Sequence, residues 1–92
     1  MFLEIVTPEA SLVSGEVVSV TVPGVNGPFQ MLNNHAPVVS TLGEGKVFFR
    51  GEPQFSEGFE NKFTKEKDGK WSLDINSGTV EMKENKIIVL AD

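Results

Sequence analysis

Apolar and polar residues alternate with a period of two in several short runs of this sequence. The clearest run, Val18 to Val22, reads valine, serine, valine, threonine, valine. Because successive side chains of a strand point to opposite faces, this run predicts a β-strand with one face in a core. We expect a turn at Ser14 to Glu16 to lead into this strand. Pro23 should end it, since proline cannot donate a hydrogen bond to a neighbouring strand.

Other short runs are rich in β-branched and aromatic residues. One precedes the clearest run and contains Leu3, Ile5 and Val6. The remaining predicted strands cover Phe29 to Leu32, Val47 to Arg50, Phe59 to Thr64, Trp71 to Asn76, Thr79 to Lys83 and Ile87 to Leu90. No stretch keeps the spacing of an amphipathic helix without glycine or proline in it. Many short strands separated by frequent turns are typical of an all-β sandwich or barrel.

Two tight turns predict antiparallel hairpins. Asp68-Gly69 stands between two predicted strands, and Asp-Gly suits the positive φ angles of a type I′ turn. Glu84-Asn85 forms a similarly short link between the last two predicted strands, where asparagine tolerates the left-handed region. Gly51 to Gly58 lacks clear alternation and contains Pro53, so we expect a loop or a sheet edge there.

The length and composition allow one domain. A chain of 92 residues buries roughly 60 to 70% of its unfolded surface and supports a single core, so we expect one domain over residues 1–92. Cysteine is absent, which excludes disulfides and thiolate metal sites. The first residues lack the pattern of a signal peptide, and no run of about 18 apolar residues occurs, so we expect neither secretion by such a signal nor a membrane span.

Charge is distributed unevenly around a net value of -5. No Lys or Arg precedes Lys46, so clustered phosphate contacts are not available and nucleic acid is not an expected partner. Several lysines fall between Lys62 and Lys70, interrupted by Glu66 and Asp68. This arrangement favours a solvated hairpin tip.

The sequence is poor in catalytic chemistry. His35 is the only histidine, and no acid or nucleophile is spaced to act with it. One imidazole among scattered carboxylates also leaves most ligand positions of a metal site unfilled, so neither a metal nor another cofactor is expected. The stretch Ser40 to Val47 lacks the first glycine and the hydroxyl residue of a phosphate-binding loop, and we interpret it as a loop between strands.

Several segments occur together in a specific order: Leu3 to Glu9, Ser14 to Val17, Ser19 to Gly24, Leu32 to Pro37 and Asn85 to Asp92. This series resembles the N-terminal domain of the epsilon subunit of the proton-translocating ATP synthase. The resemblance is specific over Leu3 to Thr41 and Ser77 to Asp92, whereas Gly51 to Asn76 matches only by its strand pattern.

The resemblance implies a flattened β-sandwich of two antiparallel sheets with about ten short strands. It implies a non-catalytic subunit of the central stalk, bound to the gamma subunit and to the c-ring, and a monomer in isolation. Its place would be peripheral, at the cytoplasmic face of the bacterial inner membrane. Members of the family often continue into a helical hairpin, and Met1 and the end at Asp92 favour a naturally short form without it.

The resemblance also implies where partners bind. Family members often carry Gly-Glu-Phe-Gly in the loop that faces the ring, where this chain has Gly27-Pro28-Phe29-Gln30, so the acidic contact is lost at Pro28. Apolar residues interrupt this polar segment, and we expect Met31 to be presented to a partner, the alternative being that Met31 belongs to the core. His35 either fixes the turn before a strand or contacts a partner directly. The candidate partner-binding residues are Pro28, Phe29, Gln30, Met31 and His35.

Two other functions remain as alternatives. A β-sandwich that binds a carbohydrate or a peptide would be favoured by an exposed aromatic platform. Trp71 alternates with Leu73 and Ile75, which predicts that its ring points into the core. A small hydrolase is the weakest alternative, because no catalytic constellation is present.

Overall fold

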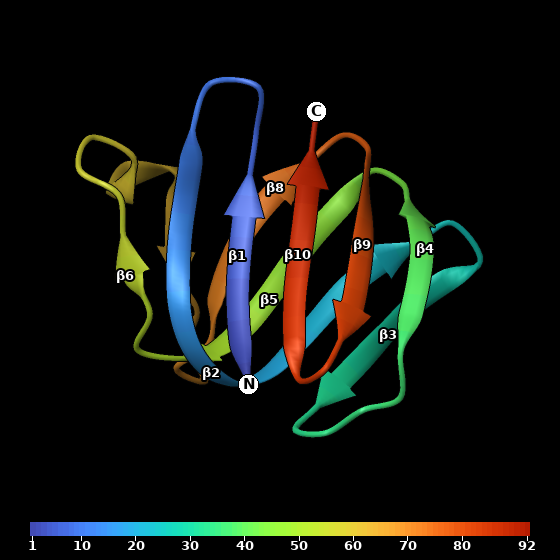
Figure 1. Ribbon diagram of the computed structural model, residues 1–92. Helices are drawn as coiled ribbons and strands as arrows, with labels where there is room; N and C mark the ends of the chain where they lie inside the picture. Colours follow the sequence, from blue (N-terminus) through green and yellow to red (C-terminus); the bar gives the residue numbers. More distant parts are fainter.

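The computed structural model describes residues 1–92 and consists almost entirely of β-strands (Figure 1). The ten strands are β1 (Phe2–Val6), β2 (Ser11–Gly24), β3 (Gly27–Leu32), β4 (Val38–Leu42), β5 (Gly45–Gly51), β6 (Gln54–Phe55), β7 (Phe63–Lys65), β8 (Trp71–Ile75), β9 (Gly78–Lys83) and β10 (Lys86–Ala91). The one helical segment is a single 3₁₀ turn, η1 (Glu60–Lys62). The structure contains no helix with the length and hydrophobicity to cross a membrane.

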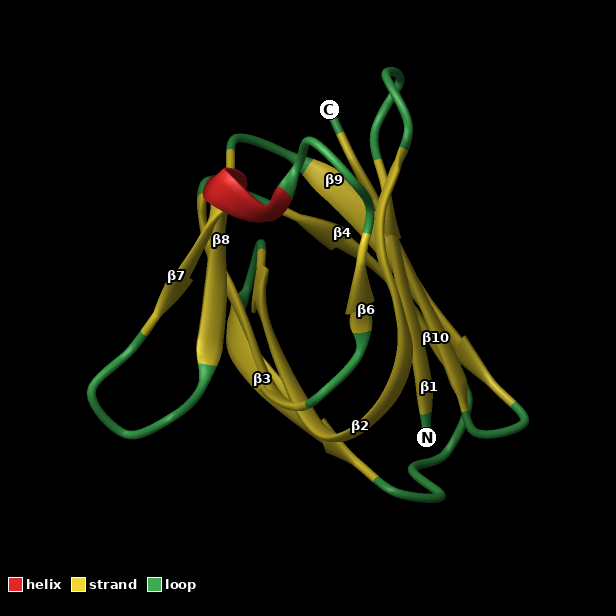
Figure 2. Ribbon diagram, turned by 90° about the vertical axis from the view of Figure 1, so that its left-hand side faces the viewer, coloured by secondary structure: helices red, strands yellow, loops and turns green.

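One long strand, β2, joins two sheets that pack face to face. Its first part pairs with β1 and β6, and its second part pairs with β3 and β5. The front sheet in Figure 1 runs β6, β2, β1, β10, β9, β4, and the rear sheet runs β3, β2, β5, β8, β7. The side view in Figure 2 shows β2 curving from one layer into the other. The predicted all-β sandwich is therefore confirmed.

Strand directions depart from the expectation at one place. All pairs are antiparallel except β1 and β10, which run parallel with Val6 beside Leu90 and Glu4 beside Ile88. These strands come from the two ends of the chain, so no hairpin has to connect them and either direction is possible.

The core lies between the two sheets and is apolar. Its fully buried side chains include Leu3 and Ile5 from β1, Val20 and Val22 from β2, and Phe49 from β5. The alternation that predicted a strand at Val18 to Val22 holds for Val20 and Val22. It fails at Val18, which is 61% exposed while Ser19 is buried, because the register with β5 shifts at a bulge between Val17 and Ser19.

No turn forms at Ser14 to Glu16, contrary to the sequence-based expectation. The strand bends there without breaking, and Gly15 has a φ of 148°. A Cβ atom at Gly15 would lie 2.9 Å from the Cα of Pro53, in the segment that crosses the bend. Glycine is used here because the chain must change sheets under a close backbone neighbour.

The two predicted hairpins are present with different turns. Glu84 and Asn85 have φ values of 52° and 60°, as a type I′ turn requires, and they join β9 to β10. The β7–β8 hairpin also forms, but the type I′ prediction is wrong because only Gly69 has a positive φ. Its amide donates to the carbonyl of Glu66, so the turn occupies one residue more than a type I′ link.

Other element boundaries differ from the predictions. Ser40 to Val47 is not one loop, because β4 and β5 occupy most of it and leave a link of Gly43 and Glu44. The strand predicted from Phe59 begins only at Phe63, after η1. The segment Gly51 to Gly58 contains the short edge strand β6, as expected of a loop or edge.

Candidate interaction surface

A continuous segment of the chain carries no Asp, Glu, Lys or Arg. It extends from residue 17 to residue 43, between Glu16 and Glu44, in a protein in which 23% of residues are charged. The segment forms the second part of β2, all of β3, the following turn and β4. We call the solvent-facing part of residues 17–43 the neutral surface.

Most of the strongly exposed apolar side chains lie on the neutral surface. They are Val18, Val25, Leu32 and Val39, with Val39 reaching 77% exposure. The fifth large apolar side chain exposed in the chain is Leu90, on β10. Exposed apolar side chains gathered on one segment are typical of a protein-binding surface, and Glu81 on β9 lies directly beside Val39 at its edge.

The predicted partner-binding residues of β3 alternate between solvent and core along the strand. Pro28 and Gln30 are exposed, Phe29 is half-buried against the core, and Met31 is completely buried. The expectation that Met31 is presented to a partner is therefore wrong. Leu32, which is 53% exposed, is the apolar residue that this strand presents to solvent.

His35 lies in an exposed turn between β3 and β4. Its amide donates to the carbonyl of Leu32 at 3.0 Å, and Asn34 before it has a φ of 64°. The carbonyl oxygen of Ala36 accepts a hydrogen bond from Nδ1 of His35 at 2.7 Å. The imidazole contacts its own turn and remains accessible, so both of its expected roles are sterically open.

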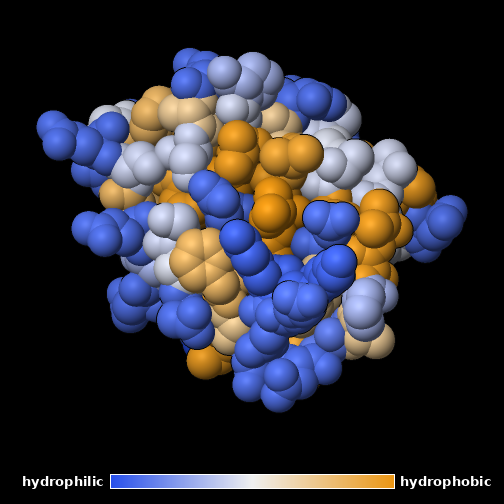
Figure 3. All heavy atoms as spheres, in the orientation of Figure 1, coloured by the Kyte–Doolittle hydropathy of each residue, from blue (hydrophilic) through white to orange (hydrophobic).

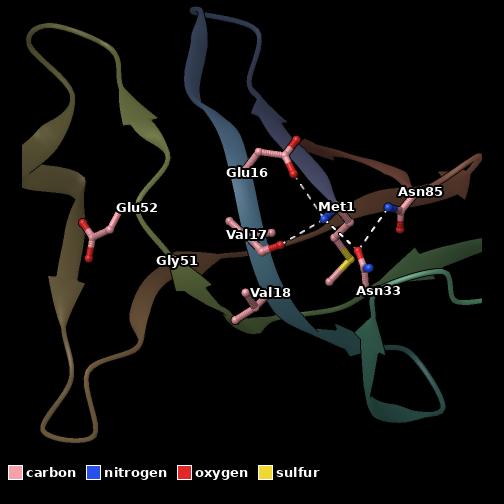
Figure 4. Close-up of a pocket in the computed structure, with 8 residues that line it drawn as sticks. All are labelled: Met1, Glu16, Val17, Val18, Asn33, Gly51, Glu52 and Asn85. Carbon is pink, nitrogen blue, oxygen red and sulfur yellow. Dashed lines mark hydrogen bonds and ion pairs between the residues drawn. The ribbon is translucent and has the colours of Figure 1, made fainter.

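Hydrogen bonds fix the turn between β3 and β4 to the rest of the domain, along a groove of about 720 Å³ (Figure 4). The amino group of Met1 donates to the carbonyl of Val17 at 3.1 Å and to Oδ1 of Asn33 at 2.9 Å. Asn85 donates to the same Oδ1 at 3.0 Å and accepts from the amide of Asn34 at 2.7 Å. These bonds hold the turn against the β9–β10 hairpin, and sequence patterns did not reveal them because Asn85 is far in the chain from Asn33 and Asn34.

An apolar stripe lies on the outer face of the front sheet. Val6 and Leu90 are neighbours on β1 and β10, and Ile88 is on the same face of β10. In Figure 3 apolar side chains gather over the upper half of these strands and, to the right, over β4. We call Val6, Ile88 and Leu90 the apolar stripe.

Trp71 does not form an exposed platform. It is half-buried and packs against the core, as its alternation predicted, with its ring 4.8 Å from that of Phe55. The ammonium of Lys65 lies 4.5 Å from the ring centroid, and the indole N–H is buried without a hydrogen-bond partner. The ring is thus used for packing on both faces.

Charged side chains lie at the solvent boundary, and several of them form ion pairs. The lysines of the β7–β8 region are exposed or half-exposed, and Lys62 and Lys65 lie 3.8 and 3.9 Å from Glu9 and Glu52. This confirms the predicted solvated hairpin.

A hydrogen bond from Lys46 to Asp74 raises the pKa of the lysine, although both side chains are exposed. Such pairs contribute little to stability.

One carboxylate is stabilised by the backbone. Hydrogen bonds from its own amide and then from those of Gly58 and Phe59 lower the pKa of Glu60 at the start of η1. No group of three or more His, Asp or Glu side chains is close enough to hold a metal ion.

These features define a class of protein: a small rigid β-sandwich with an uncharged outer surface and a separate apolar stripe, built for contact with other proteins. The chain belongs to the ATP synthase delta/epsilon chain β-sandwich family, whose model matches residues 1–92. The epsilon chain is a non-catalytic subunit, so the prediction that this chain is not an enzyme is confirmed.

Relatives support this assignment over nearly the whole chain. The ATP synthase epsilon chain of Chlorobium limicola is 34% identical and that of Chlorobaculum tepidum 38% identical, each over 98% of this chain and 86% of the relative. The epsilon chain of Maridesulfovibrio salexigens is 33% identical over all of this chain, which spans only 54% of that relative.

A solved structure has the same fold. The central stalk and c-ring of the mitochondrial ATP synthase of Tetrahymena thermophila contain a chain that matches with a TM-score of 0.66, covering 99% of this chain and 62% of that one. At 14% identity this likeness concerns the fold alone.

Proposed function

We propose that residues 1–92 form one domain that acts as a central-stalk subunit of the proton-translocating ATP synthase, linking the gamma subunit to the c-ring. The domain transmits torque between these partners, so that proton flow is coupled to ATP synthesis. Its place is the cytoplasmic face of the bacterial inner membrane, where the complex holds it, and in isolation it is a monomer.

The observation that carries the proposal is that the outer faces of both sheets expose apolar side chains on one rigid body. The apolar stripe is on the outer face of the front sheet, and Pro28, Gln30 and Leu32 are on the outer face of the rear sheet. A linker between two partners needs two such faces and a core that does not deform. We assign the apolar stripe to the gamma subunit and the β3 region, with His35 nearby, to the ring.

A peptide-binding module is the second candidate, because β3 has no neighbour on one side. A carbohydrate-binding module is less favoured, since no phenylalanine or tryptophan ring in the chain is fully exposed.

The test compares two charged substitutions in the complex. Leu90→Asp places an unpaired carboxylate in the apolar stripe, and we expect it to weaken retention by a gamma and c-ring subcomplex about tenfold or more. Thr64→Asp adds the same charge to exposed β7 on the other sheet and should leave retention unchanged. Pull-down of the purified chains measures both.

The outcome separates the candidates. If the unaltered chain is not retained by the subcomplex, the rotor function is wrong. If Leu90→Asp is folded and is retained as well as the parent, the apolar stripe is not the gamma contact.

A further inference from the structure

The direction of the backbone groups of β3 follows from two prolines. Pro23 on β2 lies directly opposite Pro28 on β3. A hydrogen-bonded antiparallel pair exchanges two N–H groups, which neither proline has, so this must be a non-hydrogen-bonded pair. The carbonyl of Pro23 accordingly points away from β3 and accepts from the amide of Gly43 at 2.8 Å.

Alternation extends this assignment along β3. Phe29 and Met31 exchange hydrogen bonds with β2, whereas Pro28, Gln30 and Leu32 direct their backbone groups to the opposite side. That side has no neighbouring strand, because β3 pairs only with β2. The Leu32 carbonyl is occupied by His35, which leaves four free groups: the carbonyl of Pro28, both groups of Gln30 and the amide of Leu32.

The edge formed by these groups lacks the usual protection against strand addition. Exposed edges are commonly protected by lysine or other charged residues, by bulges or by a covering segment. No charged residue lies on β3 or anywhere in residues 17–43, and β4 approaches only the hairpin tip, where Leu42 lies beside Gly24. Pro28 protects one end, so the open part is centred on Gln30.

We propose that the free edge of β3 receives an uncharged extended segment of a partner protein as an added strand, with Gln30 exchanging both backbone hydrogen bonds with it. The absence of charged residues on the strand matches a neutral segment and gives no preference to an acidic or basic one. Leu32 supplies an apolar contact on the outer face beside it.

The length of the edge argues against a second copy of this chain as the occupant. Three residues on each side bury far less than the roughly 1,000 Å² expected of a stable interface. A segment of a subunit that the complex already holds against this face of the domain has a high effective concentration, and a short strand contact then suffices. The inference therefore rests on the proposed rotor function, in which such a subunit is present.

Amide hydrogen exchange tests the backbone contact directly. In the free chain, the amides of Gln30 and Leu32 should exchange at least about tenfold faster than those of Phe29 and Met31, which are bonded to β2. On binding to the gamma and c-ring subcomplex, the Gln30 amide should become as slow as its neighbours. If it stays fast while the chain is retained, strand addition is wrong although the rotor function stands.

A pair of variants separates backbone from side chain. Gln30→Pro removes the outward N–H together with the side chain, which an edge strand tolerates, and should lower retention about tenfold while circular dichroism stays that of the parent. Gln30→Val removes the same side chain but keeps the N–H, so it should be retained clearly better than Gln30→Pro. Equal retention of both variants overturns the proposal, as does loss of both.

Two further outcomes identify a different occupant. Retention that falls steeply between about 0.05 and 0.5 M NaCl in the parent, but not in Gln30→Pro, means that the added segment is charged. Slow, concentration-dependent exchange of the Gln30 amide in the free chain means that a second copy occupies the edge. Failure of the parent to bind the subcomplex overturns the rotor function and this inference together.

Discussion

Met31 lies in the core, although both of its neighbours in β3 are at the surface. The residue is fully buried opposite Val20, whereas Gln30 and Leu32 on either side are exposed. An unbranched thioether side chain fills the space between the sheets without a polar group to satisfy. Its contribution is therefore to packing, and the surface of β3 belongs to its neighbours.

We expect Met31→Ala to lower the free energy of unfolding by about 2 to 5 kcal/mol, because it removes a fully buried side chain and leaves a cavity. Gln30→Ala, one position along on the exposed face, should change it by less than about 0.5 kcal/mol. Urea denaturation followed by circular dichroism measures both. A larger effect of Gln30→Ala than of Met31→Ala would mean that the strand is shifted by one residue from the register described.

Residue-level patterns predicted this region only in part. The alternation of β2 gave the buried positions of Val20 and Val22 correctly but not those of Val18 and Ser19, where a bulge exchanges the two faces. In β3 the outward residues include Pro28 and Leu32, so polarity does not mark the faces and Met31 was placed on the wrong side. The pairing of Pro23 with Pro28 fixes the parity, but it is visible only once the two strands are known to be aligned.

At the scale of elements, β2 determines the architecture. It bends at Gly15 and so provides neighbours for strands of both sheets. A turn at this place would separate the chain into two strands and leave each sheet with its own edge. The close approach of Pro53 explains why the bend needs a residue without a side chain.

Gly15→Ala should therefore destabilise the domain by about 1 to 3 kcal/mol, since alanine is strained at a φ of 148° and its Cβ would meet Pro53. Gly43→Ala is the matched control, because a Cβ there meets only Val25 at 3.8 Å. Thermal unfolding of both variants measures the difference. A Gly15→Ala variant as stable as the Gly43→Ala variant would contradict the geometry of the bend.

Element boundaries were predictable where local turn chemistry decides them. Glu84-Asn85 specifies a type I′ turn through positions that tolerate positive φ, and the structure has that turn. In contrast, β4 and β6 depend on partners distant in sequence. β4 pairs with β9, and β6 pairs with the first part of β2. The groove around Met1 and Asn33 also depends on such distant contacts, and no local pattern identifies it.

At the scale of the whole molecule, the shared strand makes the two sheets one mechanical unit. Because β2 belongs to both sheets, detaching it from one sheet would expose the core that the two sheets share. A second connection is made by β4, where Leu42 lies beside Gly24 of β2. The domain measures 32 × 25 × 24 Å, so its contact surfaces are held at fixed positions on a small rigid body. Such rigidity is what transmission of torque between two partners requires.

This architecture predicts a single cooperative unfolding transition. Trp71, the only tryptophan, reports on β8 and on the rings of Phe55 and Phe63, whereas far-ultraviolet circular dichroism reports on both sheets. Because β2 joins the sheets, we expect the two signals to give the same urea midpoint, as a two-state domain of this size does. Phe55→Leu, which keeps an apolar side chain at the tryptophan, should lower the midpoint of both signals equally. A fluorescence transition at clearly lower urea, with circular dichroism unchanged, would show that the segment around β6 and η1 unfolds separately and that the sandwich is not one rigid unit.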